Sequence, residues 1–128
     1  MTVLLDTSAF IWMSIDPSRL STRAASVIAD PSNVRLLSAA SVFEMAVKIG
    51  LGKLTLHAPL ELVVQDGLAK GVVDEFPITI SHSLMVERLP THHRDPFDRL
   101  LVAQATVAGV PIVTSDPLIA KYGVPLIW

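Results

Sequence analysis

The sequence predicts an α/β protein whose strands form a parallel sheet. Five short β-rich runs alternate with segments of helical periodicity, which is the pattern typical of βαβ units. The first run, Val3-Leu4-Leu5, is continuously apolar, as expected for a strand that is covered on both faces. We predict strands over residues 3–5, 34–37, 72–76, 111–113 and 124–127, and helices over residues 7–14, 18–29, 40–51, 59–70, 79–89 and 96–108.

Residues that favour helix ends support several of the predicted helices. Ser18 or Ser21 is placed to cap the second helix, because a serine side chain accepts a hydrogen bond from the first turn. Ser38 precedes the third helix, and Pro59 opens the fourth. Gly109 follows the sixth helix, where a residue without a side chain is favoured.

The composition is that of one soluble domain spanning residues 1–128. Hydrophobic residues make up 51% of the chain and charged residues 17%, which excludes a disordered protein and leaves apolar surface for a partner. No apolar run approaches the roughly 18 residues of a membrane span, and the N-terminus lacks the basic start of a signal peptide. We therefore expect a cytoplasmic protein without contact to a membrane.

The absence of cysteine and the net charge limit the chemistry that the protein can perform. The chain has no cysteine, which excludes thiolate metal ligands and cysteine nucleophiles. The net charge is −2, so any nucleic acid would have to be held by a local basic patch rather than by overall attraction.

Aspartates follow two of the predicted strands directly. Asp6 stands in VLLDTSAF and Asp116 in PIVTSDPL, each before a turn into a possible helix. Either residue alone is well explained as a helix cap or a loop residue. The pair is more informative, because ligands of open parallel sheets gather at the carboxyl ends of the strands.

Two acids on helices extend this set. Glu44 lies four residues before Lys48, and taken alone the pair is better explained as a surface ion pair that stabilises a helix by only about 0.2–0.5 kcal/mol. In HHRDPFDRL, Asp95 is placed to cap the predicted helix. Asp98 lies one turn further on, and it either supports that cap or belongs to an acidic site.

If the four acids converge, a cation has to neutralise them. Unit charges about 5 Å apart repel by roughly 3 kcal/mol at an effective dielectric constant near 20, and four groups make six pairs. Oxygen ligands without cysteine favour Mg²⁺ or Mn²⁺. Such a site suits hydrolysis of phosphate esters by activated water, with Ser8, Thr114 or Ser115 positioned to hold water or ligand.

With these residues in view, the sequence resembles the PIN-domain family, and more closely the VapC-type ribonuclease toxins of bacterial toxin–antitoxin pairs. The resemblance covers nearly the whole chain. It rests on four motifs in order: LLDTSAFIW, SAASVFEMAVKIGLGKL, HHRDPFDRLLVAQA and IVTSD. The fold implied is a three-layer α/β sandwich around a mostly parallel central sheet.

The resemblance also implies an activity and a site. The acids that hold the metal carry over to Asp6, Glu44, Asp98 and Asp116, and Thr114 matches a hydroxyl position two residues before the last acid. The implied activity is a Mg²⁺- or Mn²⁺-dependent endoribonuclease with RNA as substrate, restrained by a cognate antitoxin protein.

The sequence departs from the family pattern at two places. Phe43 stands where tryptophan is common beside the glutamate, and Asp95 adds an acid that is not general to the family. Because Asp98 matches the family's acid, the resemblance implies that Asp95 is the helix cap and a group beside the metal ligands. Neither departure removes a ligand.

The remaining candidates are groups that would hold RNA or a partner. Basic residues near the acidic motifs could contact RNA but are better explained as ordinary surface groups: Lys48, Lys53, Arg94, Arg99, His92 and His93. The apolar stretch 10–13 is explained mostly by core packing, and any exposed part of it would suit an antitoxin helix or a homodimer face.

Three other classes of protein are alternatives to a ribonuclease. A phosphatase of the haloacid-dehalogenase type needs an aspartate where Ser8 stands, and a response-regulator receiver needs a lysine that Thr114-Ser115-Asp116 does not offer. A non-catalytic PIN-like module, which binds metal and a partner without cleaving RNA, stays open.

Overall fold

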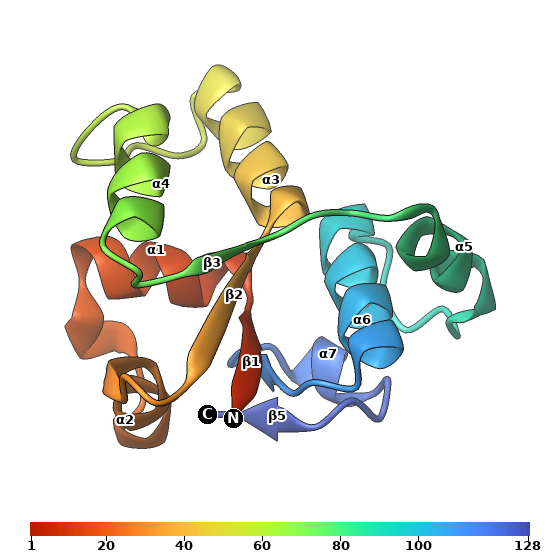
Figure 1. Cartoon of the computed structure of the whole chain (residues 1–128). Helices are drawn as coiled ribbons and strands as arrows, with labels where there is room; N and C mark the ends of the chain where they lie inside the picture. The colour runs from red at the N-terminus through yellow and green to blue at the C-terminus, as the bar shows by residue number, and fades with distance from the viewer.

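The computed structural model describes residues 1–128 and forms a five-stranded sheet between helices (Figure 1). The strands are β1 (Thr2–Leu5), β2 (Val34–Ser38), β3 (Asp74–Phe76), β4 (Ile112–Val113) and β5 (Leu126–Ile127). The helices are α1 (Thr7–Ile15), α2 (Thr22–Ala29), α3 (Ala39–Gly50), α4 (Leu60–Ala69), α5 (Ile80–Arg88), α6 (Pro96–Ala108) and α7 (Pro117–Ala120), with a short 3-10 helix η1 (Pro17–Arg19) after α1. None of the helices has the length and apolar character needed to cross a membrane.

All neighbouring strands are parallel, in the order β3-β2-β1-β4-β5. The central strand β1 pairs with β2 on one side and β4 on the other, with Leu4 opposite both Leu36 and Ile112. The chain builds the sheet outward from β1 through β2 to β3 and then returns to the other side of β1. The strand order therefore reverses between β1 and β4, which is where α/β proteins place their ligands.

Two apolar layers cover the sheet, because successive side chains of a strand point to opposite faces. Val3 and Leu5 pack into a cluster with residues of α1, α2 and α4, whereas Leu4 packs on the opposite face against α6 and α7. All three side chains are fully buried. Figure 1 shows α1, α2 and α4 on one side of the sheet and α6 and α7 on the other. The predicted three-layer α/β sandwich is confirmed, with a sheet that is parallel throughout.

The prediction of one helix over residues 18–29 was wrong. The chain first forms η1, then adopts extended backbone at Leu20 and Ser21 before α2 begins at Thr22. Ser21 accepts a hydrogen bond from the backbone N–H of Ala24, so it is Ser21 rather than Ser18 that caps the helix. Two consecutive extended residues cannot continue a helix, and the cap restarts it.

A buried amide fixes α6 against the edge of the sheet. Gln104 is fully buried, accepts a hydrogen bond from Ser38 Oγ at 2.5 Å and donates one to the carbonyl of Pro77 at 3.3 Å. Both partners lie at strand ends: Ser38 is the last residue of β2, and Pro77 directly follows β3. The helix is thereby positioned with its N-terminus at the carboxyl edge of the sheet.

Candidate metal centre

Asp6 and Asp116 follow the neighbouring strands β1 and β4, at the point where the strand order reverses. Each also caps the helix that it precedes. Asp6 Oδ1 accepts a hydrogen bond from the N–H of Ala9 at 2.7 Å, and Asp116 Oδ1 accepts one from the N–H of Leu118 at 2.8 Å. The capping function and a role in a site are therefore compatible, because the cap uses only one oxygen of each carboxylate and fixes the side chain.

Glu44 lies in the buried first half of α3, with 4% of its surface exposed. Its Oε1 accepts a hydrogen bond from Thr7 Oγ1 at 2.7 Å, and its Oε2 is 2.5 Å from Lys48 Nζ. The ion pair predicted as one alternative is present, but its acid is buried rather than on the surface. A buried carboxylate requires such partners, because burial without them disfavours its charge.

Thr7 was not among the residues singled out from the sequence, whereas the helical spacing places Ser41 on the same face as Glu44. Thr7 Oγ1 lies 3.0 Å from Ser41 Oγ, and both residues are buried between α1 and α3. Ser8, which was singled out, is exposed on α1. The signal available was the position of Thr7, directly after Asp6 and in the first turn of a helix that begins at the sheet edge.

Asp95 caps α6 and leaves Asp98 free of that task. Asp95 Oδ1 accepts hydrogen bonds from the N–H groups of Phe97 at 2.9 Å and Asp98 at 3.2 Å. The side chain of Asp98 is 19% exposed and lies 3.7 Å from His93 Nε2. The second aspartate of the motif thus faces the cluster of acids instead of the helix end.

The capping role of Asp95 predicts the relative stabilities of two variants. Asp95→Ala should destabilise the protein by about 1 kcal/mol, because the N–H groups of the first turn lose their acceptor. Asp95→Asn keeps an acceptor and removes a charge that repels Asp98, so it should be at least as stable as the wild type. Urea unfolding at pH 7 with EDTA measures both variants, and equal stabilities of the Ala and Asn variants would contradict this role.

Burial and mutual repulsion raise the pKa of two of the acids. The pKa of Asp6 rises from 3.8 to about 6, mainly because the group is buried, with Asp116 and Glu44 adding repulsion. Hydrogen bonds from the Thr114 side chain and the Ala9 backbone oppose this rise. The pKa of Asp98 rises to about 7, again first through burial and then through the charges of Asp95, Glu44, Asp116 and Asp6. Asp6, Glu44 and Asp116 therefore lie close enough to Asp98 to raise its pKa.

This donor set fits a divalent cation. Ligand atoms of His93, Asp98 and Asp116 all lie within 4.8 Å of one another, and Asp6 and Glu44 repel Asp98 from nearby. Carboxylate oxygens are the ligands that Mg²⁺ and Mn²⁺ prefer, and an ion would relieve the repulsion that raises these pKa values.

The hydroxyl and basic residues named from the sequence lie in different surroundings. Thr114 is buried, and its Oγ1 accepts a hydrogen bond from the N–H of Asp116 at 3.0 Å. Lys48 lies by the acids, and its pKa is raised, first by its hydrogen bond to Glu44. Arg99 is directed elsewhere: its guanidinium donates to the carbonyls of Pro90 at 2.8 Å and Val86 at 3.0 Å. Arg99 thus ties the segment before α6 to α5.

The apolar stretch 10–13 packs mostly against the protein itself. Phe10 is buried in the core. The ring of Trp12 packs against that of Trp128 with centroids 5.7 Å apart, and the guanidinium of Arg19 lies 4.6 Å from the Trp12 centroid. The expectation that core packing explains most of this stretch agrees with these contacts.

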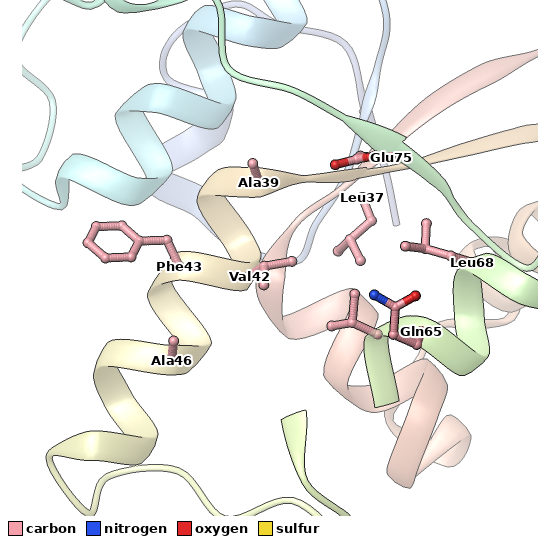
Figure 2. A pocket seen from close by; sticks show the side chains of 9 residues that line it. Leu37, Ala39, Val42, Phe43, Ala46, Gln65, Leu68 and Glu75 are labelled. Carbon is pink, nitrogen blue, oxygen red and sulfur yellow. The ribbon is translucent and has the colours of Figure 1, made fainter. Parts of the chain in front are cut away.

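An apolar cleft of about 410 Å³ lies between α3 and α4. Figure 2 shows Leu37, Val42 and Leu68 converging on it from β2, α3 and α4. Phe43 borders the cleft and is 62% exposed, and its ring meets the ring of Phe97 edge-on at 5.8 Å. Phe43 and Glu44 lie on the same helix, so the cleft shares α3 with one of the four acids.

Several solved structures have the same fold. VapBC2 from Rickettsia felis, bound to a DNA fragment from their promoter, aligns with a TM-score of 0.71 at 13% identity, covering 98% of this chain and 97% of that chain. FitAcB from Neisseria gonorrhoeae aligns at 0.61 with 17% identity, covering 97% and 95%. VapBC-1 from nontypeable Haemophilus influenzae aligns at 0.62 with 14% identity, covering 98% and 96%. At these identities the alignments show a shared fold.

Sequence comparisons give the family. Curated protein sequences offered no match. The family model described as the PIN domain matches residues 3–125, which is nearly the whole chain and includes all four acids at the sheet edge. The chain therefore belongs to the PIN-domain family.

Proposed function

We propose that this protein is a metal-dependent endoribonuclease, the toxin component of a toxin–antitoxin pair. The observation that carries the proposal is the group of acids, Asp6, Glu44, Asp98 and Asp116, gathered where the strand order of a parallel sheet reverses. The membership in the PIN-domain family and the fold shared with the VapBC and FitAB structures support it.

The acids would hold Mg²⁺ or Mn²⁺, and hydrolysis by water activated on such an ion requires no protein nucleophile. When bound, the ion supplies a Lewis acid that polarises the phosphate and lowers the pKa of a coordinated water. The chain's own groups then have defined tasks. Thr114 and the N–H of Ala9 hold the Asp6 carboxylate, and Thr7 holds that of Glu44. Lys48 balances the charge of Glu44 and presents a cation near incoming phosphate.

The test is cleavage of a mixed pool of structured cellular RNA by the purified chain. We expect discrete fragments with Mg²⁺ and with Mn²⁺, and none with EDTA, because four clustered acids without an ion repel the phosphate. Fragments of equal yield in EDTA would overturn the proposal. Metal binding without any cleavage would favour the non-catalytic module, in which the same site only engages a partner.

A cognate antitoxin is the second part of this proposal, and the cleft beside Phe43 is the surface that we assign to it. The cleft is lined mostly by apolar side chains from β2, α3 and α4, with Gln65 and Glu75 as its polar members. A fitting occupant is an amphipathic antitoxin segment with apolar residues and one basic or hydrogen-bonding side chain to meet Glu75. Bound there, the segment would contact α3, the helix that also carries Glu44.

This assignment predicts the effect of one added charge. Ala46 is exposed on α3 and lines the cleft, so Ala46→Glu should weaken antitoxin binding at least about tenfold, because a carboxylate would be buried against apolar surface without a partner. Ala108→Glu, at the exposed end of α6, introduces the same charge away from the cleft and should bind as the wild type does. Binding of the product of the neighbouring gene is measured by calorimetry. Equal affinities of the two variants would contradict the assignment. A homodimer stays a prediction that the size of the chain in solution can test.

A further inference from the structure

His93 points an unpartnered nitrogen at the acidic cluster. Its side chain is only 8% exposed, and its Nε2 is buried without a hydrogen-bond partner. Nε2 lies 3.7 Å from Asp98 Oδ2, and ligand atoms of His93, Asp98 and Asp116 lie within 4.8 Å of one another. A distance of 3.7 Å is too long for a hydrogen bond. It suits two atoms that share one ion, since atoms each about 2.1 Å from the same metal lie roughly 3–4 Å apart.

The other side of the ring is held in place. His93 Nδ1 lies 2.9 Å from Tyr122 Oη, and Tyr122 Oη also receives a hydrogen bond from Arg99 Nη1 at 3.2 Å. Arg99 is in turn bound to the carbonyls of Pro90 and Val86. This anchoring resembles that of metal-binding histidines, whose second nitrogen is usually held by a polar partner that fixes the tautomer and the ring orientation.

Neither neutral tautomer satisfies Nε2 within the protein. With the proton on Nδ1 and donated to Tyr122, Nε2 carries a lone pair that faces carboxylates. With the proton on Nε2, the N–H finds no acceptor within hydrogen-bond distance. A divalent cation between Nε2 and the carboxylates of Asp98 and Asp116 satisfies the first tautomer and neutralises the acids.

We infer that His93 is a nitrogen ligand of the metal, added to the four acids. This inference rests on the metal site of the proposed function but does not depend on RNA cleavage. A mixed site of imidazole and carboxylates binds Mn²⁺ in preference to Mg²⁺, because Mg²⁺ favours oxygen ligands alone. His93 would thus shift the site toward Mn²⁺.

The deciding experiment is electron spin-echo envelope modulation on the full chain loaded with Mn²⁺. The wild type should show the ¹⁴N coupling of a directly bound imidazole, and uniform ¹⁵N-histidine labelling should change it to a ¹⁵N signal. His93→Gln should abolish the signal. His92→Gln, which alters the exposed neighbour that also packs on Tyr122, should retain it. In calorimetry, His93→Gln should weaken Mn²⁺ binding about tenfold and Mg²⁺ binding less than about threefold.

The outcomes separate this inference from the proposed function. Mn²⁺ bound without nitrogen coupling in the wild type would overturn the role of His93, for instance in favour of an imidazolium paired with Asp98, and would leave the acidic site intact. Equal losses of Mn²⁺ and Mg²⁺ affinity in His93→Gln would likewise overturn the role of His93 and leave the acidic site intact. Absence of any Mn²⁺ binding to the wild type would instead overturn the metal site itself. The wild-type spectrum decides the matter even if the variant fails to fold.

Discussion

Asp98→Asn is expected to lower Mg²⁺-dependent RNA cleavage at least about 100-fold while the fold is retained. Loss of a group that only supports a metal ligand commonly costs 10–100-fold, so loss of a ligand should reach the upper end or exceed it. The fold should persist because Asp95, not Asp98, caps α6. Removal of a charge that four neighbouring acids repel should even stabilise the protein without metal.

Rates of fragment formation from one RNA, at fixed Mg²⁺, measure this effect. The matched control is Asp66→Asn, which makes the same substitution at an exposed acid of α4 that is paired with Lys70. The control should cleave like the wild type. A rate for Asp98→Asn within a few-fold of the control, with circular dichroism showing both folded, would contradict the proposed site.

The second large effect is a dependence of stability on pH that metal reverses. In EDTA, the free energy of unfolding should fall as the pH rises from about 4 to about 7 and then level off. The folded protein holds the pKa of Asp6 at about 6 and that of Asp98 at about 7, whereas unfolded aspartates titrate near 3.8. Between these values the folded state binds more protons than the unfolded state, so rising pH favours unfolding.

The pKa of Asp6, the more deeply buried of the two acids, sets the expected change in the free energy of unfolding. A rise from 3.8 to about 6 at Asp6 corresponds to about 3 kcal/mol, which is on the order of 10 °C in melting temperature for a domain of this size. Melting curves from pH 4 to pH 8 should show a smaller decline for Asp98→Asn than for the wild type. With Mg²⁺ the wild type should gain stability as the pH rises, because protons compete with the ion. Identical profiles with EDTA and Mg²⁺ would show that no ion binds these acids.

The fold was largely predictable from the chain because local patterns decided it. Buried runs such as Val3–Leu5 specify strands that are covered on both faces, and Ser38 and Gly109 mark helix ends that the structure retains. The break between η1 and α2 was missed, because periodicity continues across Leu20 and Ser21 while their backbone is extended. The placement of acids after β1 and β4 followed from the parallel sheet.

The surroundings of the acids were less predictable, because they depend on contacts between distant segments. Thr7 meets Glu44 across 37 residues, and His93 meets Tyr122 across 29. Nothing in the sequence distinguishes His93 from the adjacent His92, yet one is buried by the cluster and the other exposed. Arg99 was grouped with possible RNA contacts from its position beside Asp98, but in a helix adjacent residues face different directions, and its guanidinium binds backbone carbonyls instead.

The central claim is that water, activated at the acidic site, cleaves RNA. Its most direct test is mass spectrometry of the RNA fragments formed with Mg²⁺ in H₂¹⁸O. Attack by water places one ¹⁸O in the single terminal phosphate that each cut creates, leaves a hydroxyl on the other new end and forms no cyclic phosphate, and this is the result that we predict. Fragments that end in a 2′,3′-cyclic phosphate without ¹⁸O would show attack by the RNA's own 2′-hydroxyl and contradict the account.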